Sequence, residues 1–587
     1  MAITLRHIFP GRSDRGWLVA SAVVACLVAA PIVALAFIAL QGTGDLWPHI
    51  VTDVFPSTFA DTVTLLVGVG IIVTTIGTGL AWLLTAYEFP GRRIFEWALL
   101  LPLAVPTYIV AYAYLDLLHP IGPVQTGIRA ALGLTSPRDL VFPDIRSMGG
   151  CILVLSFVLY PYVYLSTRAM FLMQAGSILE AARTLGAGRS RVFFRVALPL
   201  ARPAIAAGVT LALLEALNDI GASEFLGVKT MSVTIYSTWI NQSNLPGAAQ
   251  IALFMLLLIV GLMMLERWAR HGQQYVSMAQ RTRRAAPRKL RGWSAGAAIG
   301  LALIPVFFGF LMPAAYLARE ALARIKFAGI SADISREIVN TMTISAVATA
   351  VALTIGLLVA YTARITRGRS AKVILRIASL GYAVPGTVLA IGLLAPLTAF
   401  DNAFADASEY LLGITPGLIM TGTGAALIYA YSTRFLTISA GGVESGLAKL
   451  PMSLDFASRT LGQTATGTIR RVHLPLIRPA LGAAALLVFV DCMKELPATL
   501  LLRPLNFETL ATHLYGEAAR GTYEDGSIAA LAIVLFGLIP VILLARLSRR
   551  PALAYDARQV GRPGALDDMM LGPDPAQGVA SATQNVR

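Results

Sequence analysis

The sequence predicts an all-α polytopic membrane protein in which about twelve transmembrane helices form two parallel six-helix repeats. Three observations lead to this fold class. The 587 residues are 56% hydrophobic and only 13% charged, which is more apolar surface than a soluble protein could bury. Apolar runs long enough to cross a bilayer alternate with short polar segments. Finally, residues of the first half recur in the second half at a constant offset.

The basic residues are distributed as expected for a membrane protein. The net charge is +15, but the lysines and arginines lie in short runs between apolar spans, as the positive-inside rule predicts. We therefore do not expect nucleic acid as a partner. The three cysteines form no CxxC pair and the six histidines lack ligand spacing. No disulfide, zinc site or cofactor is predicted, and the sequence identifies no other metal site.

The first six spans alternate with connections whose charge predicts their side of the membrane. Three arginines precede the first span, which is too long for a signal peptide, so the N-terminus is expected in the cytoplasm. Arg92 and Arg93 follow the second span on the same side. The third contains Pro102 and Pro106, which a membrane helix tolerates when its neighbours satisfy the freed carbonyls. These spans are expected over residues 17–40, 62–87, 94–118, 148–172, 204–226 and 248–265.

A linker rich in Lys and Arg separates the halves, and a second set of six spans begins at Trp293. Because each set contains an even number of spans, both halves enter the membrane in the same direction and are parallel repeats. The basic loop 319–336 falls outside in this count, against the positive-inside rule. We expect this division: 1–61, N-terminal arm and first span; 62–265, first repeat; 266–292, cytoplasmic linker; 293–337, seventh span and outer loop; 338–545, second repeat; 546–587, disordered cytoplasmic tail.

Specific residues mark the repeat. The matches at one offset are Thr62, Thr64 and Gly77 with Thr341, Thr343 and Gly356, and Ala104-Val105-Pro106 with Ala383-Val384-Pro385.

Two polar, basic islands, residues 177–203 and 453–479, correspond to each other at a second constant offset. In the first island, Ser177 and Glu180 form a capping box that should start a helix. Gly186 supplies the left-handed residue that stops it, and Pro199 and Pro203 are expected to end a second helical piece. The residues shared by the second island include Arg459, Leu461, Gly462, Pro475 and Pro479.

The first island resembles the EAA loop of the permease subunits of bacterial ATP-binding-cassette (ABC) importers. The resemblance implies the type I ABC importer permease fold, with each loop forming a coupling helix in a groove of an ATPase subunit. In the second island Phe456, Ala457 and Ser458 occupy the EAA positions, and Asp455 is expected to replace the missing glutamate at the helix dipole. The candidate coupling residues are Glu180, Ala181, Ala182 and Gly186 in the first loop and Asp455, Ala457, Ser458 and Gly462 in the second.

The resemblance also implies the partners. We expect two copies of an ABC ATPase subunit, a periplasmic or lipid-anchored solute-binding protein, and membrane lipid. The chain has no Gly-Lys-Ser or Gly-Lys-Thr and hence no P-loop, so it is not expected to be an enzyme, and ATP hydrolysis is expected in the separate subunits. The expected location is the bacterial inner membrane, with both termini cytoplasmic.

Ionisable residues in two predicted spans are candidates for the translocation pathway, because buried charge in a bilayer is costly. Glu215 corresponds to Asp491 and Asp219 to Glu495, and each pair is expected on one helical face at i, i+4. If the repeats face each other, four acids surround a shared axis. They either form a passage for a cation or make structural ion pairs. The candidates are Glu215, Asp219, Glu224, Asp491, Lys494 and Glu495.

The expected cargo comes mainly from resemblance. Residues 218–239 and 494–504 are similar to those of fused two-repeat ferric iron permeases, and Fe(III) is a hard cation that suits oxygen ligands. Thiamine and polyamines remain alternative cargoes, since they are cations with permeases of similar design. A secondary transporter independent of ATPase subunits is the alternative from another class, but it leaves the paired islands unexplained.

Overall fold

A computed structural model describes residues 12–42, 48, 50–173, 184–270, 287–366 and 368–549. Nearly all of these residues are helical, which confirms the predicted fold class. The chain divides into one unit that ends at Val541 and a second that begins at Ile542. The described part of the second unit, residues 542–549, is the last stretch of a helix.

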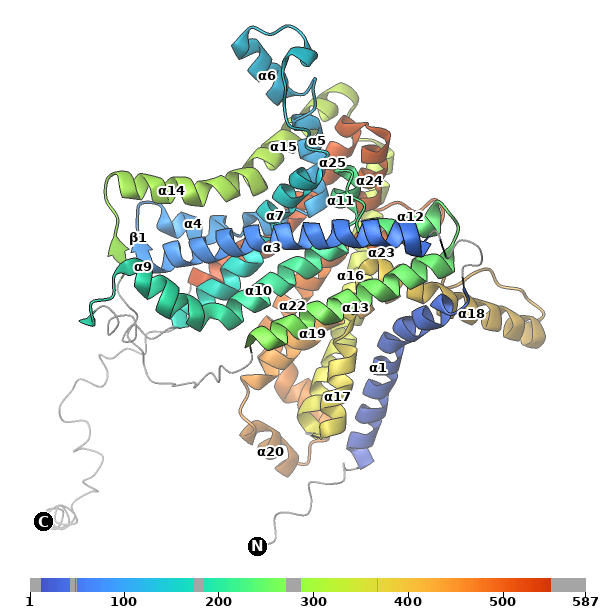
Figure 1. The fold of residues 1–587 in the computed structure, drawn as a ribbon. Coiled ribbons are helices and arrows are strands. Elements are labelled where there is room, and N and C mark those ends of the chain that lie inside the picture. The colour runs from blue at the N-terminus through green and yellow to red at the C-terminus, as the bar shows by residue number, and fades with distance from the viewer. Residues whose placement is uncertain are drawn as a thin grey trace, which may run out of the picture. The chain divides into compact units, whose positions relative to one another are not determined.

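The described residues of the first half are mostly helical (Figure 1). Its elements are α1 (Arg12–Ala39), η2 (Ile50–Val54), α3 (Phe55–Ala86), β1 (Tyr87–Glu88), α4 (Arg92–Ala98), η3 (Leu101–Ala104), α5 (Thr107–Leu117), α6 (Pro123–Leu132), η4 (Pro137–Asp139), α7 (Met148–Met173), α9 (Arg189–Val192), η5 (Phe193–Ala197), α10 (Leu198–Asn218), α11 (Gly221–Phe225), α12 (Met231–Ile240) and α13 (Leu245–Arg270).

The second half repeats this order. Its elements are β2 (Arg288–Lys289), α14 (Trp293–Val306), η6 (Phe307–Leu311), α15 (Met312–Ala328), α16 (Ala332–Thr366), α17 (Arg369–Ala378), η7 (Gly381–Ala383), α18 (Gly386–Leu412), α19 (Ala425–Ala448), α20 (Ser453–Thr460), α21 (Ala465–Thr468), η8 (Ile469–His473), α22 (Leu474–Met493), α23 (Pro497–Leu502), α24 (Leu510–Arg520) and α25 (Tyr523–Arg549). The two strands form one short parallel pair.

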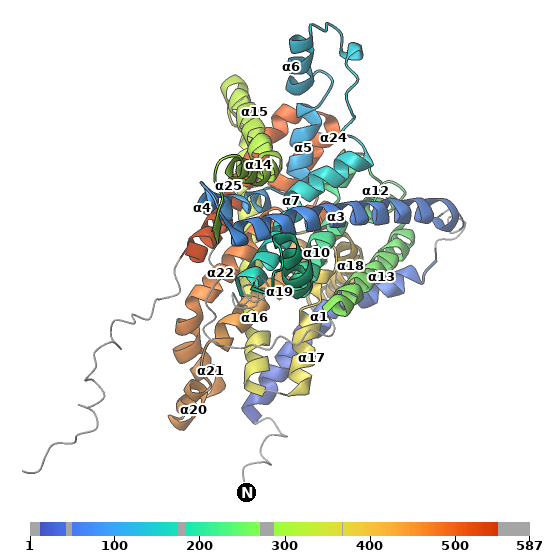
Figure 2. The same cartoon turned by 60° about the vertical axis from the view of Figure 1, so that its left-hand side comes forward.

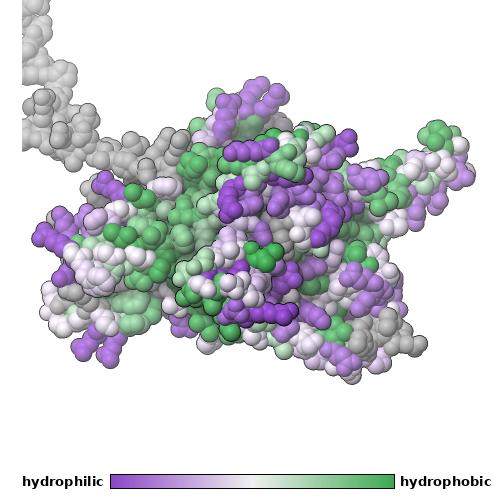
Figure 3. Space-filling model, turned by 90° about the horizontal axis from the view of Figure 1, so that it is seen from above, coloured by the Kyte–Doolittle hydropathy of each residue, from purple (hydrophilic) through white to green (hydrophobic). Residues whose placement is uncertain are grey.

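Ten helices in the described residues are long and apolar enough to cross a membrane, or eleven if one bent pair forms a single span. That pair, Arg92–Ala104 with Thr107–Leu117, bends by 88° at the prolines of the predicted third span. The remaining predicted span corresponds to α19, which carries Arg434 and several hydroxyl groups and packs between α16 and α22. Large apolar side chains stay exposed on many of these helices, as the green areas of Figure 3 show and as lipid contact requires.

The first helix of each half packs against the other half. Helix α1 contacts α16, α17 and α18 (Figure 2), and Ser21 of α1 donates a 2.8 Å hydrogen bond to Thr362 of α16. In return α14, η6 and α15 contact α3, α4, α5 and α7, and the hydroxyl of Tyr114 donates a 2.7 Å hydrogen bond to the Phe308 carbonyl. The halves are therefore interlocked.

Two corresponding glycines lie at close helix crossings. A Cβ atom at Gly77 of α3 would lie 2.7 Å from the Val163 Cβ of α7, and one at Gly356 of α16 would lie 2.4 Å from the Ser439 hydroxyl of α19. Such separations are below van der Waals contact, so only glycine fits. The repeat seen in the sequence is thus a repeat of packing.

The expectation that Pro199 and Pro203 end a helix is wrong. Helix α10 begins at Leu198 and continues through both prolines to Asn218. The preceding turn, η5, widens into a π-helix, in which the Leu198 N–H donates to the Phe193 carbonyl five residues back. Because proline cannot donate to the carbonyl four residues earlier, a widened turn accommodates it. The second half has the same arrangement at η8 and Pro475.

Candidate functional site

A cavity of about 100 Å³ lies between the two halves, and five of the six predicted pathway residues line it. Glu215 and Asp219 reach it from the end of α10, and Asp491, Lys494 and Glu495 from the end of α22. Other lining residues come from the start of α5, from η7, from the end of α10 and from α7 and α19; they include Thr107, Tyr108, Val158, Tyr162, Asn218, Tyr382 and Arg434. The structure therefore brings the four acids around one space shared by the repeats.

Hydrogen bonds across this cavity join the halves. The hydroxyl of Tyr382 donates to Glu215 Oε1 at 2.7 Å, and the backbone N–H of Gly386 donates to Asn218 Oδ1 at 2.8 Å. The Tyr108 hydroxyl makes a longer 3.4 Å contact with the Lys494 carbonyl. Any movement of one half against the other must break or lengthen these bonds.

The prediction that each acid pair lies on one helical face is wrong. Helix α10 ends at Asn218 and α22 at Met493, so Asp219 and Glu495 lie just beyond the helices. Both carboxylates instead accept backbone N–H groups of the following short helix. Asp219 accepts those of the third and fourth residues after it at 2.8 and 3.1 Å, and Glu495 does the same at 3.0 and 3.0 Å. Because they satisfy helix N-termini, the chain breaks where the sequence suggested continuity.

The two halves differ in how their acids are compensated. In the second half, Arg434 lies 2.6 Å from Glu495, and Lys494 lies 2.8 Å from Asp491. At the position of the first half that corresponds to Arg434 stands Val158, and Asp219 is bound by the hydroxyl of Thr107. The cavity lining therefore contains four carboxylates and two basic side chains. Its acidic excess lies on the side of the first half.

Glu224, the sixth predicted residue, does not line this cavity. Its Oε2 accepts a 2.7 Å hydrogen bond from the hydroxyl of Tyr515, on α24 of the second half. Tyr515 also stacks on Phe225, with ring centroids 5.7 Å apart. Glu224 thus takes part in a separate contact between the halves.

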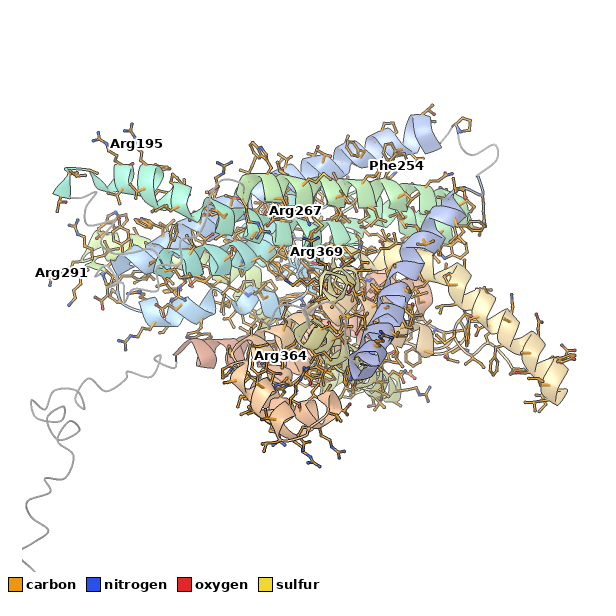
Figure 4. The ribbon with its side chains drawn as sticks, turned by 90° about the horizontal axis from the view of Figure 1, so that it is seen from below. Arg195, Phe254, Arg267, Arg291, Arg364 and Arg369 are labelled. Carbon is orange, nitrogen blue, oxygen red and sulfur yellow. The ribbon has the colours of Figure 1, made fainter. Side chains whose placement is uncertain are left out.

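The second basic island forms a helix, α20, tied to the membrane helices by Asp455. The carboxylate of Asp455 lies 2.6 Å from the guanidinium of Arg364 in α16 and 3.3 Å from His473 in η8. Arg364 is labelled in Figure 4. Arg364 also donates to the carbonyls of Leu447 and Leu450. Asp455 does lie in the first turn of α20, as predicted, but its carboxylate is directed inward to an ion pair.

The other candidate residues of the second island divide between core and surface. Ser458 is buried, with its hydroxyl 2.8 Å from that of Thr468, whereas Ala457 is exposed. Gly462 has φ of 77°, so it ends the helix in the left-handed conformation. The exposed surface here includes Phe456 and Leu461, at 59% and 80% exposure.

The first island is described only from residue 184 onward. Gly186 has φ of 81°, as its predicted role requires, and Leu185, which corresponds to Leu461, is 87% exposed. The candidates Glu180, Ala181 and Ala182 lie outside the described residues, so their coupling role stays a prediction.

Comparisons with known proteins identify the family. Residues 74–271 match the family described as binding-protein-dependent transport system inner membrane component. The molybdenum transport system permease protein ModB of Escherichia coli (strain K12) is 31% identical over 33% of this chain and 83% of ModB. The chain belongs to this family. It is a multi-pass membrane permease of an ABC importer, a transport component whose family implies an ATPase and a solute-binding protein as partners.

Two further relatives resemble the permease over most of its length. The Fe(3+)-transport system permease protein FbpB 2 of Haemophilus influenzae is 23% identical over 83% of this chain and 88% of the relative. The ferric transport system permease protein FbpB of Actinobacillus pleuropneumoniae is 24% identical over 81% of this chain and 68% of the relative. These alignments cover more than four fifths of the chain and so extend over both repeats. This agrees with the prediction that the chain is a fusion of two halves.

Sequence reasoning missed the residues that accompany the acids. Arg434 was detectable as an arginine inside an apolar stretch, a costly placement that calls for a partner. Tyr382 and Thr107 gave no such signal, because single hydroxyl groups are common in membrane helices. Arg364 gave no signal of its own, because its ion pair with Asp455, 91 residues later, depends on folding.

Proposed function

We propose that this permease imports ferric iron, delivered by an extracytoplasmic binding protein and driven by ATP hydrolysis in two separate ATPase subunits. The observation that carries the cargo is the acidic excess of the cavity shared by the two halves, which favours a cation over an anion. The ferric transport functions of the two long relatives support the same cargo. In the described residues no three His, Cys, Asp or Glu side chains are grouped to hold a metal ion, which suits a passage better than a storage site.

The two basic islands are proposed as the ATPase contacts. Leu185 and Leu461, which correspond in the repeat and are strongly exposed, would enter the groove of one ATPase subunit each. The islands then face the cytoplasm, as do both termini, and the repeats extend over residues 62–265 and 338–545. Closure of the ATPase subunits on ATP would pull the islands together and move the halves against each other.

The alternatives concern the cargo, since the family match identifies an ABC importer permease and does not support the secondary transporter. The name of ModB specifies molybdenum, and cationic thiamine or polyamines also fit an acidic cavity.

Reconstitution tests the proposal directly. Proteoliposomes that contain the permease and its ATPase subunit, supplied with loaded binding protein, should accumulate radiolabelled iron only when ATP is present on the side of the islands. Accumulation of iron without ATPase subunits would contradict the proposed ATP-driven mechanism. If the proteoliposomes accumulate another solute with ATP but do not accumulate iron, the importer function is supported and ferric iron is the wrong cargo.

Glu215 is the acid best suited to test the pathway. Neutralising Asp219 or Glu495 would also remove helix caps, whereas Glu215→Gln retains an acceptor for Tyr382. We expect Glu215→Gln to lower iron uptake while assembly with the ATPase and thermal stability stay near wild type. The exposed Glu444→Gln on α19 is the matched control and should transport normally. If Glu215→Gln takes up iron at the wild-type rate, the charge of Glu215 is not needed for transport and its role is structural.

A further inference from the structure

An apolar groove of about 590 Å³ lies between α10 and α13 in the first half. Most of its lining side chains are aliphatic, and Thr74 of α3 contributes to it as well. The volume is in the range of sites that hold small organic ligands, about 300–1,000 Å³. Its apolar lining residues include Leu198, Ile205, Ala206, Val209, Leu213, Leu262 and Leu265. Such a groove favours hydrocarbon over water.

One end of the groove is basic. Arg202, at the C-terminal end of the first island, lines it, and its guanidinium lies 5.6 Å from the ring centre of Trp268 on α13. Glu266, also in the lining, is paired with Arg270 at 2.7 Å, and within the described part of the chain no carboxylate pairs with Arg202. Arg267 adds a further exposed positive charge near the end of α13 (Figure 4).

We propose that the groove binds one anionic phospholipid, with an acyl chain between α10 and α13 and the phosphate at Arg202. The charge supports this occupant, because arginine forms two parallel hydrogen bonds with a phosphate. Basic pockets between transmembrane helices at the cytoplasmic face are typical sites for acidic lipid headgroups. The inference rests on the proposed orientation, which brings this end of the groove to the cytoplasmic leaflet.

The position of the groove gives the lipid a consequence for transport. Helix α10 begins within the first island and ends at the central cavity, where it carries Glu215. A lipid chain wedged against α10 would support the helix that links the ATPase contact to the cavity. The second half has Arg478 at the position of Arg202, on an exposed part of α22, but Arg478 does not line this groove.

Native mass spectrometry of the full-length permease tests this assignment. The protein is extracted from bilayers of equal phosphatidylglycerol and phosphatidylethanolamine content and is stripped of lipid in steps. The wild type should retain one phosphatidylglycerol after phosphatidylethanolamine has been lost. Arg202→Ala should lose it, and Ala206→Trp, which fills the groove, should lose it as well. Arg478→Ala should retain it.

Several outcomes overturn the proposal. If the wild type and Arg202→Ala retain phosphatidylglycerol equally, Arg202 does not bind the phosphate. If Ala206→Trp retains it, the lipid binds outside this groove. Displacement by millimolar inorganic phosphate would identify a free anion site. Retention of both lipids alike would show that headgroup charge is irrelevant. Iron uptake is measured separately, so a failure of the lipid assignment is distinct from a failure of the proposed transport function.

Discussion

Among single residues, the ion pair of Arg434 and Glu495 most clearly distinguishes the second half of the cavity from the first. Both side chains are almost completely buried, at 10% and 1% exposure. The pair fits because Gly386 lies beside it: a Cβ there would be 2.4 Å from Nη1 of Arg434 and 2.7 Å from Oε1 of Glu495. The corresponding residue of the first half is Thr107, where no arginine has to be accommodated.

We expect Gly386→Ala to displace this pair. Overpacking of a filled site costs about 1–3 kcal/mol, so the variant should show a lower apparent Tm and reduced uptake. Gly441→Ala is the control, because a Cβ there meets nothing within 4 Å although Gly441 is on the same helix as Arg434. Thermal unfolding in detergent gives the apparent Tm of the two variants, and uptake is measured in proteoliposomes. Equal Tm values for the two variants would mean that the pair does not constrain Gly386.

The elements show how an island is held in place. Asp455 lies in the first turn of α20 and joins it to α16 and η8 through Arg364 and His473. At the positions of Arg364 and His473, the first half has Thr85 and Ala197, which cannot form this network. The second island is therefore fixed by an ionic network whose Arg364 and His473 positions carry no ionisable side chain in the first half.

Asp455→Asn should loosen α20 without unfolding the permease. Hydrogen bonds to charged groups contribute about 1.5–3 kcal/mol, so the free energy of opening α20 should fall by up to that amount. Hydrogen exchange over residues 453–462 should speed up, and ATP hydrolysis stimulated by the binding protein should decrease. Glu444→Gln should change neither. Unaltered exchange in Asp455→Asn would show that the helix is held by its apolar contacts alone.

Helix α24 is joined to α16 by a titratable contact. Nδ1 of His513 lies 3.0 Å from Oε1 of Glu337. This hydrogen bond, with the charges of Glu337, Glu517 and Glu508, raises the pKa of His513 despite the opposing effect of burial. Because the pKa is raised on folding, the stabilisation is complete below the unfolded value of about 6.5 and is lost as pH rises through the raised pKa.

His513→Gln should therefore lower the apparent Tm more at pH 6 than at pH 9. Thermal unfolding of both proteins at the two pH values measures this difference. A decrease that is the same at both pH values would show that the proton on His513 does not contribute to stability.

Over the whole molecule, the sequence predicted the features that local physics determines. The spans were predicted from the apolar runs, and the two repeats from residues that recur at constant offsets. The acids of the cavity were predicted from the cost of burying charge in a bilayer. It did not predict that α1 packs against the second half and α14 against the first, because the sequence pattern does not specify which apolar faces come into contact. Nor did it reveal that α10 and α22 end before Asp219 and Glu495, since a carboxylate that caps a helix resembles one that continues it.

The central claim is that ATP moves the two islands, and with them the two halves, relative to each other. The corresponding exposed residues Leu185 and Leu461 are suitable spin-label positions in a variant that carries Leu185→Cys and Leu461→Cys, with the exposed Cys26 changed to Ser. Pulsed electron resonance on the reconstituted complex with its ATPase subunits measures the distance between the labels. The proposed mechanism predicts a shorter distance in the state that vanadate traps after ATP addition, in which the ATPase subunits are closed on ADP and vanadate, than without nucleotide. An unchanged distance in a complex that still hydrolyses ATP would contradict it.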